Sequence, residues 1–178
     1  MLKDFGLKYI DIMIGVVLGL GFQWWPNLTE FWQYIAFIFI YLNLIDYWID
    51  YSPTIKKFPL INQVDVILHT GIFFAMFLMV YYTQTSVQNV FLSFLLFRVF
   101  DILWILRMQN EYPVTTRDRL FMGTWLKGNA VEFIATLGLL VLALRWHIPG
   151  LILMGAFILC RVSTRILSSI HYKKVFYA

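Results

Sequence analysis

The stretch SFLLFRVFDILW, residues Ser93–Trp104, places an arginine and an aspartate inside an otherwise apolar and aromatic run. Arg98 facing lipid near the centre of a bilayer would cost at least about 2.5–3.5 kcal/mol. Residues three apart lie on the same face of a helix, so Arg98 and Asp101 point the same way. We expect this helix to turn both side chains toward other helices, which indicates a helical bundle with a polar interior.

The composition of the whole chain is that of an integral membrane protein. Of its 178 residues, 61% are hydrophobic, 19% are aromatic and only 13% are charged. A soluble domain carries about a quarter charged residues, and a water-soluble protein of this size could not bury so many large apolar side chains. The length predicts one membrane domain, residues 1–178, with no separate soluble module.

Six apolar stretches are long enough to cross a bilayer, and we expect them to be helical because a chain in lipid must satisfy its backbone hydrogen bonds internally. Their approximate limits are 9–25, 31–49, 63–82, 87–106, 129–146 and 148–170. Pro26, Pro53, Pro59 and Pro113 fall between these stretches, where a missing N–H does no harm. The sequence therefore predicts an all-α integral membrane protein with six transmembrane helices, paired as three hairpins.

Lysine and arginine residues predict the orientation. One side of the predicted membrane holds only Arg145. The termini and the connections on the opposite side hold Lys3, Lys8, Lys56, Lys57, Arg107, Arg117, Arg119, Lys127, Lys173 and Lys174. Because cytoplasmic loops are enriched in Lys and Arg, both termini are predicted to be cytoplasmic, in a bacterial-type inner membrane or a plasma membrane.

The longest connection, residues 107–128, is predicted to be a cytoplasmic loop. Its second half, Arg117 to Lys127, mixes basic, aromatic and apolar residues and fits an amphipathic helix at the membrane interface, and a loop that docks a partner is the alternative. The net charge of +4 is explained by attraction to anionic lipid headgroups. The lipid bilayer is thus a predicted partner, and nucleic acid is not.

Polar residues recur inside the spans with a spacing that suggests three copies of a two-helix unit. Odd-numbered spans share an acidic residue near their start, and even-numbered spans share two polar residues three positions apart. These are Asp11, Asp65 and Glu132 on the odd spans, and Asn43 with Asp46, Arg98 with Asp101, and Arg161 with Thr164 on the even spans. One interpretation is a threefold internal repeat about an axis along the membrane normal. The other is chance resemblance between apolar helices.

All of these polar side chains are expected near the cytoplasmic end or in the cytoplasmic half of their spans. They form either a structural lattice of ion pairs or the lining of a polar cavity. Five acids would face only three arginines, counting Arg165, and a dry core would tolerate that surplus poorly. This favours the cavity. His69, one turn after Asp65, adds a candidate proton-sensitive pair, with a structural histidine as the alternative.

Other motifs indicate packing rather than chemistry. Gly15 and Gly19 form a Gly-x-x-x-Gly pair, which permits close helix packing within the chain or between copies of it. The sequence contains no short motif typical of a hydrolase, a nucleotide-binding loop or a zinc protease, and Cys160 is its only cysteine. We therefore predict no enzyme, no catalytic residue, no metal site and no cofactor.

Three functions fit these features. The first is a homo-oligomeric ion channel or pore lined or gated by the polar residues, because six short helices leave little volume for alternating access within one copy. The second is a proton- or cation-coupled small-solute transporter that uses Asp65, His69 and Glu132. The third is a non-conducting accessory subunit or assembly factor of a larger membrane complex. The expected partners are copies of the chain and an inorganic ion or small solute.

Overall fold

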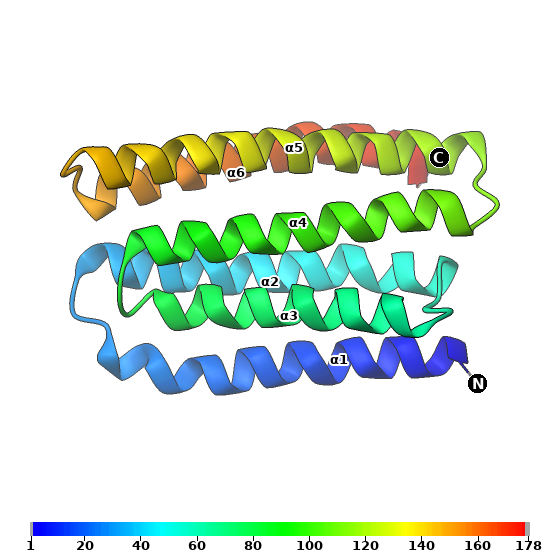
Figure 1. The fold of residues 1–178 in the computed structure, drawn as a ribbon, viewed down its shortest axis with the longest axis horizontal. Helices are drawn as coiled ribbons and strands as arrows, with labels where there is room; N and C mark the ends of the chain where they lie inside the picture. The colour runs from blue at the N-terminus through cyan, green and yellow to red at the C-terminus, as the bar shows by residue number, and fades with distance from the viewer. Residues whose placement is uncertain (1, 177–178) are drawn as a thin grey trace.

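The computed structural model describes residues 2–176 of the chain, and the side chains of residues 5–170. Within this part it contains six α-helices, one 3-10 helix and no strand, which confirms the predicted all-helical fold. The elements are α1 (Leu2–Gly21), η1 (Phe22–Asn27), α2 (Phe31–Lys57), α3 (Gln63–Tyr82), α4 (Val87–Glu111), α5 (Thr116–Arg145) and α6 (Gly150–Phe176). The helices lie side by side in an elongated bundle (Figure 1). Three residues that support the predicted orientation, Lys3, Lys173 and Lys174, lie outside the described side chains.

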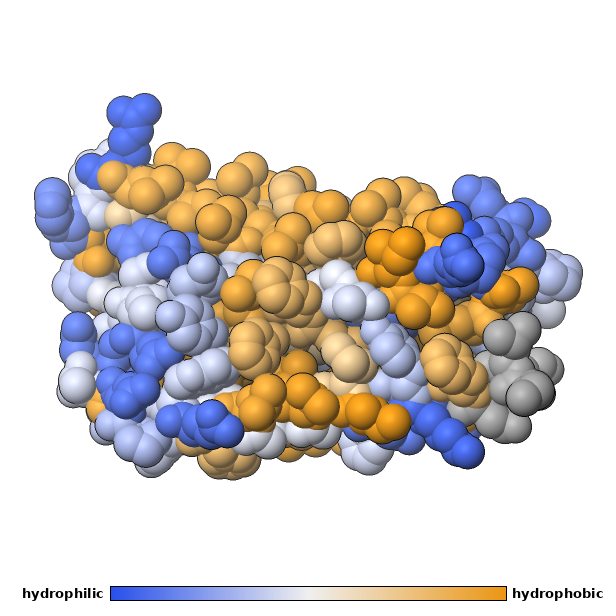
Figure 2. All heavy atoms as spheres, turned by 60° about the horizontal axis from the view of Figure 1, so that its bottom comes forward, coloured by the Kyte–Doolittle hydropathy of each residue, from blue (hydrophilic) through white to orange (hydrophobic). Residues whose placement is uncertain are grey.

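Five helical segments are long and apolar enough to cross a membrane. They are Phe5–Asn27, Gln63–Tyr82, Val87–Glu111, Thr116–Arg145 and Gly150–Ile170. On the face shown in Figure 2, apolar side chains occupy the middle of the molecule and hydrophilic side chains gather mostly toward its two ends. A helical bundle in a bilayer needs this distribution, so the structure supports an integral membrane location.

The second helix differs from the other five. α2 has 27 residues, enough to cross a bilayer, but it is not among the segments that are sufficiently apolar. Asn43, Asp46 and Asp50 lie on it at intervals of three and four residues and form one polar face. The sequence predicts six spans; the apolar character of the helices supports five, because this polar face lowers the hydropathy of α2.

Polar side chains at the helix starts explain why α2, α3 and α4 begin at the predicted positions. The Gln33 side chain accepts a hydrogen bond from the backbone N–H of Glu30, at 2.9 Å. Asp65 accepts from the N–H of Asn62, at 3.2 Å, and the Ser86 hydroxyl accepts from the N–H of Asn89, at 3.3 Å. These bonds satisfy backbone donors that have no partner within the first turn of a helix.

The prediction of a loop over all of 107–128 is wrong, whereas the helix expected over Arg117 to Lys127 is present as part of α5. α4 continues to Glu111 and α5 begins at Thr116, so only residues 112–115 connect them. Thr115 and Asp118 form a capping box in which each side chain accepts a hydrogen bond from the other's backbone N–H. Charged residues make this stretch less apolar than a span, but Arg, Lys, Leu and Met are good helix formers, so the helix extends through it.

Pro53 also fails to end the helix that contains it. It lacks the N–H that would bond the carbonyl of Ile49, yet α2 continues as far as Lys57. In the following turn, the Thr54 hydroxyl donates to the carbonyl of Asp50, at 2.9 Å. A single missing hydrogen bond is therefore tolerated within a helix that is packed on several neighbours.

Packing between helices creates two environments inside the bundle. α3 packs on α4, α4 packs on α5, α5 packs on α6, and α6 closes back on α2, while α1 covers α2 and α3 (Figure 1). The buried core between α2, α3 and α4 is largely apolar and aromatic, with Phe37, Phe73, Met76 and Phe91 among its members. Most of the buried charged groups lie instead between α4, α5 and α6.

α1 begins and α6 ends toward the same end of the bundle (Figure 1), as an even number of antiparallel helices requires. Among successive helices, α3 packs much more extensively on α4 than α1 packs on α2. The pairing of the helices as three hairpins, the threefold internal repeat and the side of the membrane that holds the termini stay predictions.

Candidate functional site

Arg98 is the centre of a buried polar network between α4 and α5. Its side chain is only 2% exposed. One terminal nitrogen donates to Asp101 Oδ2 at 3.2 Å and to Asn129 Oδ1 at 2.9 Å, and the other is ion-paired with Glu132. The guanidinium also lies over the ring of Phe97, with 4.6 Å between its carbon and the ring centroid. The buried positive charge of Arg98 is thus stabilised by two carboxylates, by one side-chain amide and by the face of an aromatic ring.

Asp101 is held by three different helices. Besides Arg98 on its own helix, it accepts a hydrogen bond from Asn129 Nδ2 of α5 at 2.7 Å and from the Tyr47 hydroxyl of α2 at 3.3 Å. Each carboxylate oxygen therefore has a donor, as a fully buried carboxylate needs. Arg98 and Asp101 therefore both face the bundle interior, as predicted.

Glu132 extends the network from α5 to α6. Its Oε2 pairs with Arg98, and its Oε1 accepts hydrogen bonds from Arg161 Nη1, at 2.8 Å, and from the Thr164 hydroxyl. One carboxylate thus joins side chains from α4 and α6, which are not adjacent in the chain. Arg161 and Thr164 reach it together because residues three apart share a face of α6.

The network ends in a more exposed group of charges between α6 and α2. Arg165 Nη2 bonds Asp46 Oδ1 at 2.8 Å, and its other terminal nitrogen is ion-paired with Asp50. Arg161 Nη2 lies 4.0 Å from Asp46 Oδ2. The side chains of Asp46 and Asp50 are 38% and 42% exposed, so water reaches the network from this edge.

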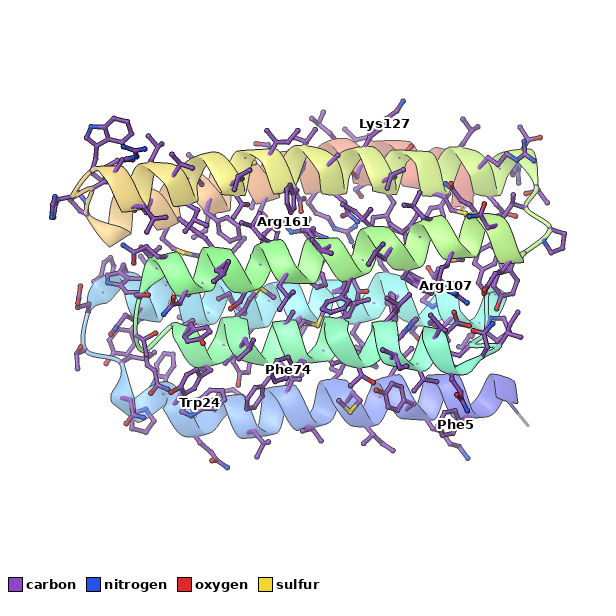
Figure 3. All side chains as sticks on the ribbon, viewed as in Figure 1. Phe5, Trp24, Phe74, Arg107, Lys127 and Arg161 are labelled. Atoms are coloured by element: carbon purple, nitrogen blue, oxygen red, sulfur yellow. The ribbon has the colours of Figure 1, made fainter. Side chains whose placement is uncertain are left out.

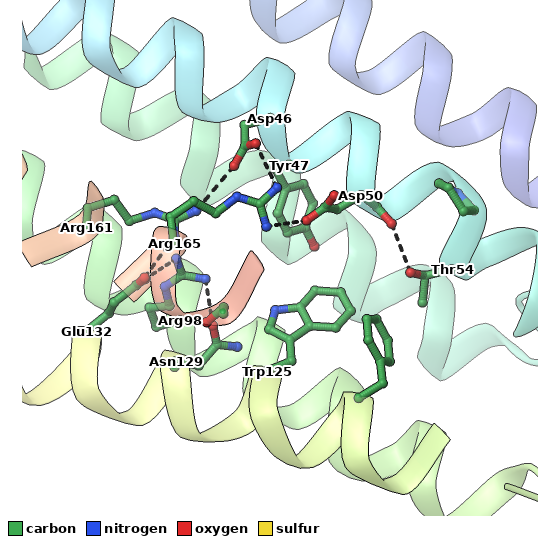
Figure 4. A pocket seen from close by; sticks show the side chains of 14 residues that line it. Asp46, Tyr47, Asp50, Thr54, Arg98, Trp125, Asn129, Glu132, Arg161 and Arg165 are labelled. Carbon is green, nitrogen blue, oxygen red and sulfur yellow. Dashed lines mark hydrogen bonds and ion pairs between the residues drawn. The ribbon is translucent and has the colours of Figure 1, made fainter. Parts of the chain in front are cut away.

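Six of these charged groups line one cavity, which we call the polar pocket (Figure 4). It has a volume of about 80 Å³ and lies between α2, α4, α5 and α6, with Trp125 and Tyr47 in its wall. Its charged lining consists of Asp46, Asp50, Arg98, Glu132, Arg161 and Arg165. For comparison, a closed cavity of about 150 Å³ holds benzene, so the polar pocket has room for a compact chemical group.

A second, smaller cavity adjoins the first, and we call it the apolar pocket. It has a volume of about 20 Å³ and its walls include Phe39, Met76, Met79 and other apolar side chains. Tyr47 and Arg161 line both pockets. In Figure 3, Arg161 lies in the interior of the bundle, between the α5–α6 pair and the layer formed by α4.

The structure brings six of the ten residues of the predicted polar cluster into this one network. These are Asp46, Arg98, Asp101, Glu132, Arg161 and Thr164. Asn43 lies beside the network, where its side-chain amide donates to the carbonyl of Phe39 at 2.9 Å and it lines the apolar pocket. Asp11 lies elsewhere, on an exposed face of α1, and accepts from Trp48 Nε1 at 2.9 Å.

Asp65 and His69 lie apart from the network, and their side chains do not form the expected pair. The Asp65 carboxylate bonds Arg107 Nε at 3.1 Å and the N–H groups of Ile61 and Asn62. The ring of His69 faces the backbone carbonyl of Asp65, with Nδ1 2.6 Å from that oxygen. The reason is that Asp65 caps the start of α3, which turns its carboxylate away from the following turn.

The predicted surplus of acids is smaller than the sequence suggests. Asp11 is at the surface, and Asp65 is neutralised by Arg107, which lies outside the predicted spans. In the network, four carboxylates face three arginines once Asp50 is included, and Asp46 and Asp50 are partly exposed. The excess negative charge is therefore placed where water can solvate it.

The predicted packing role of Gly15 and Gly19 is not used within the described part of the chain. Both glycines are exposed, and a Cβ atom added to either would have no other atom within 4 Å. This face of α1 is open to lipid or to another protein. Packing between copies therefore stays a prediction.

Sequence reasoning missed Asn129, Tyr47 and Trp125. Asn129 lies three residues before Glu132, which is the same spacing that pairs Arg98 with Asp101, so that signal was present in the sequence. Tyr47 and Trp125 carry no comparable signal, because aromatic residues are frequent throughout the chain.

No group of three or more His, Cys, Asp or Glu side chains in the described region is placed to hold a metal ion. Comparisons with known proteins give no match: no family model, curated protein or solved structure is significantly similar to this chain. The polar pocket itself is therefore the basis for a functional proposal.

Proposed function

We propose that the chain is a multi-pass membrane protein that binds a small polar solute in the polar pocket and carries it across the membrane. One observation carries this proposal: three guanidinium groups and three carboxylates line a single cavity inside the bundle of one chain. Ionisable groups within membrane helices are costly, and they usually line a substrate or ion pathway.

Unused hydrogen-bonding capacity supports solute binding over a purely structural lattice. The Nε atoms of Arg98 and Arg161 are buried, and neither has a hydrogen-bond partner among the described residues. A lattice that served only to fix the helices would be expected to satisfy such donors. Both arginines line the polar pocket, so a solute can accept hydrogen bonds from these buried donors once the network rearranges around it.

The position of the pocket favours a transporter over the predicted oligomeric pore. The charged groups meet between helices of one chain rather than on an outer surface where copies would join (Figure 4). Ion pairs between α6 and its neighbours α2 and α5 also cross this region, and they have to rearrange for anything to pass. Rearrangement around a bound solute is typical of transporters. The exposed Gly15–Gly19 face supports association of copies without making a pore between them.

A six-span topology with cytoplasmic termini is part of the proposal. α1 begins and α6 ends at one end of the bundle, and Arg107 lies toward that same end (Figures 1 and 3). α2 crosses with its neighbours, because Arg165 of α6 neutralises the acids on its polar face. In this orientation the exposed edge of the polar pocket, at Asp46 and Asp50, belongs to the cytoplasmic half of the bundle.

Purified protein in liposomes tests the proposal. We would measure uptake of radiolabelled amino acids, carboxylates, amines and sugars, with and without unlabelled solute inside the vesicles, and record currents across planar bilayers. At least one solute should show saturable uptake that preloading accelerates. Arg161→Gln should abolish it, whereas Arg145→Gln, an exposed arginine at the end of α5, should not. Unitary currents without saturable uptake would instead support the pore.

A further inference from the structure

Two pockets, one polar and one apolar, lie on either side of shared wall residues. They share Tyr47 and Arg161, so a ligand beside these two side chains lies next to both cavities. The polar part is lined by three positive and three negative side chains, whereas the apolar part is lined mainly by Phe, Met, Ile and Leu. A ligand that fills both parts must carry charged groups and an apolar group on adjacent atoms.

The free hydrogen-bonding capacity differs between the two ends of the polar pocket. At the more buried end, Arg98 and Arg161 each have an Nε–H that is closed to solvent and has no partner among the described residues. At the outer end, Asp46 and Asp50 are partly exposed, and their partner Arg165 is shared between them. A ligand carboxylate would complement the two arginines once their side chains turn these donors toward it, and a ligand ammonium would complement the outer carboxylates.

The cavity volumes limit the size of the ligand. The polar pocket, at about 80 Å³, admits a compact charged group, and the apolar pocket, at about 20 Å³, admits a group about the size of a methyl. Met76 and Met79 in its wall are flexible side chains that can adjust to a branched group. A long acyl chain or a large ring system would not fit.

From these three observations we infer that the solute is a small zwitterion with a short aliphatic side chain, in the chemical class of the aliphatic α-amino acids. Its carboxylate lies against Arg161 and Arg98, its ammonium lies against Asp46, and its side chain enters the apolar pocket past Tyr47. In such a molecule the three groups diverge from one carbon atom, so a single compact solute can reach Arg161, Asp46 and the apolar pocket together. The inference rests on the proposed function, since it assigns a substrate class to the same site.

A matched set of four compounds tests this on the unmodified protein. L-valine carries all three groups, glycine lacks the side chain, isovalerate lacks the ammonium and isobutylamine lacks the carboxylate. Each is titrated against the protein in detergent, and the unfolding temperature is measured. Valine should raise that temperature, and each of the other three should need at least tenfold higher concentration for the same shift.

Other results from this set would overturn the inference. If glycine acts as strongly as valine, the apolar pocket takes no part in binding, and if isovalerate or isobutylamine does so, the site does not recognise a zwitterion. Lysophosphatidylcholine is titrated as a fifth probe, because it too joins a zwitterion to an apolar group. Stabilisation by this lipid alone would identify the site as a lipid site and overturn the assignment to a small solute.

A variant of Met79 tests whether the aliphatic side chain of the ligand binds in the apolar pocket. Met79→Phe would fill the apolar pocket, so the response to valine should fall to that of glycine, while the response to glycine stays unchanged. Ile134→Phe, on an exposed face of α5, is the matched control and should leave both responses unchanged. A full valine response in Met79→Phe would contradict the placement. If this variant does not fold, the compound set alone decides the inference.

Failure of this inference can be told apart from failure of the proposed function. If uptake in liposomes depends on Arg161 but valine neither binds nor competes, the protein is a transporter of another solute class and the inference is overturned. If valine binds with the expected selectivity but no labelled solute enters the vesicles, the inference stands and transport is overturned.

Discussion

Two clusters of charged side chains in this bundle contain the same kinds of ion pair but differ in their exposure to solvent. On α4, Arg98 pairs with Asp101 three residues later, and Arg107 pairs with Glu111 four residues later. Each arginine also pairs with a carboxylate on a neighbouring helix. The side chain of Arg98 is 2% exposed, however, whereas that of Arg107 is 29% exposed. We call the second group, with Asn62, Asp65 and Tyr112, the end cluster.

The end cluster holds a helix connection in place. Arg107 bonds Asp65 and the side chain of Asn62 at the start of α3, and the Tyr112 hydroxyl donates to the carbonyl of Pro59. Water and headgroups can solvate these charges if a partner is lost, so each pair contributes little. In the central network a lost partner leaves a charge in a medium that cannot solvate it. Burial, rather than the type of ion pair, therefore decides how much stability is lost when one partner is removed. It also decides how strongly a cluster can bind a charged solute.

The largest effect is expected from Arg98→Ala. It leaves Asp101 and Glu132 without their shared cation, so the protein should lose on the order of 3–5 kcal/mol of stability and fold in poor yield. The double variant Arg98→Leu with Asp101→Leu should be milder, because no lone charge remains on α4. Thermal unfolding in detergent compares the two. A single variant as stable as the parent would show that burial does not distinguish the two clusters.

Arg161→Gln should have a smaller effect on stability and a large effect on uptake. Glutamine can keep a hydrogen bond to Glu132, which also retains Arg98 and Thr164, so we expect a loss of about 1–3 kcal/mol. Saturable uptake should disappear, since a charged donor is removed from both pockets. Thermal unfolding and vesicle uptake are measured on the same preparation. Normal uptake in this variant would remove Arg161 from the proposed site.

Arg107→Ala is the counterpart of Arg98→Ala in the end cluster. Because its partners are near the surface, the loss should be about 1 kcal/mol or less, and it should shrink further at high salt. Unfolding temperatures at low and high salt check this, with Arg119→Ala, an exposed arginine of α5, as the control. A loss as large as that of Arg98→Ala would contradict the comparison between the clusters.

The smallest effect concerns Tyr112. Burial, with the nearby negative charges of Asp65 and Glu111, raises the pKa of Tyr112 to about 12, above the usual value of about 10. The neutral phenol therefore contributes stability that is fully present below pH 10 and is lost as the pH rises through 12. Tyr112→Phe should be slightly less stable than the parent at neutral pH, and the difference in unfolding temperature should shrink between pH 10 and pH 12. A constant difference would contradict the raised pKa.

Local sequence determined most of the helical framework. The starts of α2, α3 and α4 agree with the prediction because capping residues and apolar periodicity act within a few residues of one another. The inward direction of Arg98 and Asp101 was predictable for the same reason. The extent of α4 and α5 was not, because hydropathy measures compatibility with lipid, and a helix can continue through charged residues outside the apolar layer.

Tertiary structure alone decided which polar groups meet. Five acids looked equivalent in the sequence, yet Asp11 faces outward because α1 lies at the edge of the bundle, and Asp65 is bound by Arg107 at the end of α4. Glu132 joins Arg98 to Arg161 only because α5 packs against both α4 and α6. Contacts between residues some thirty positions apart depend on how whole helix faces fit together, and no spacing within one helix encodes that fit.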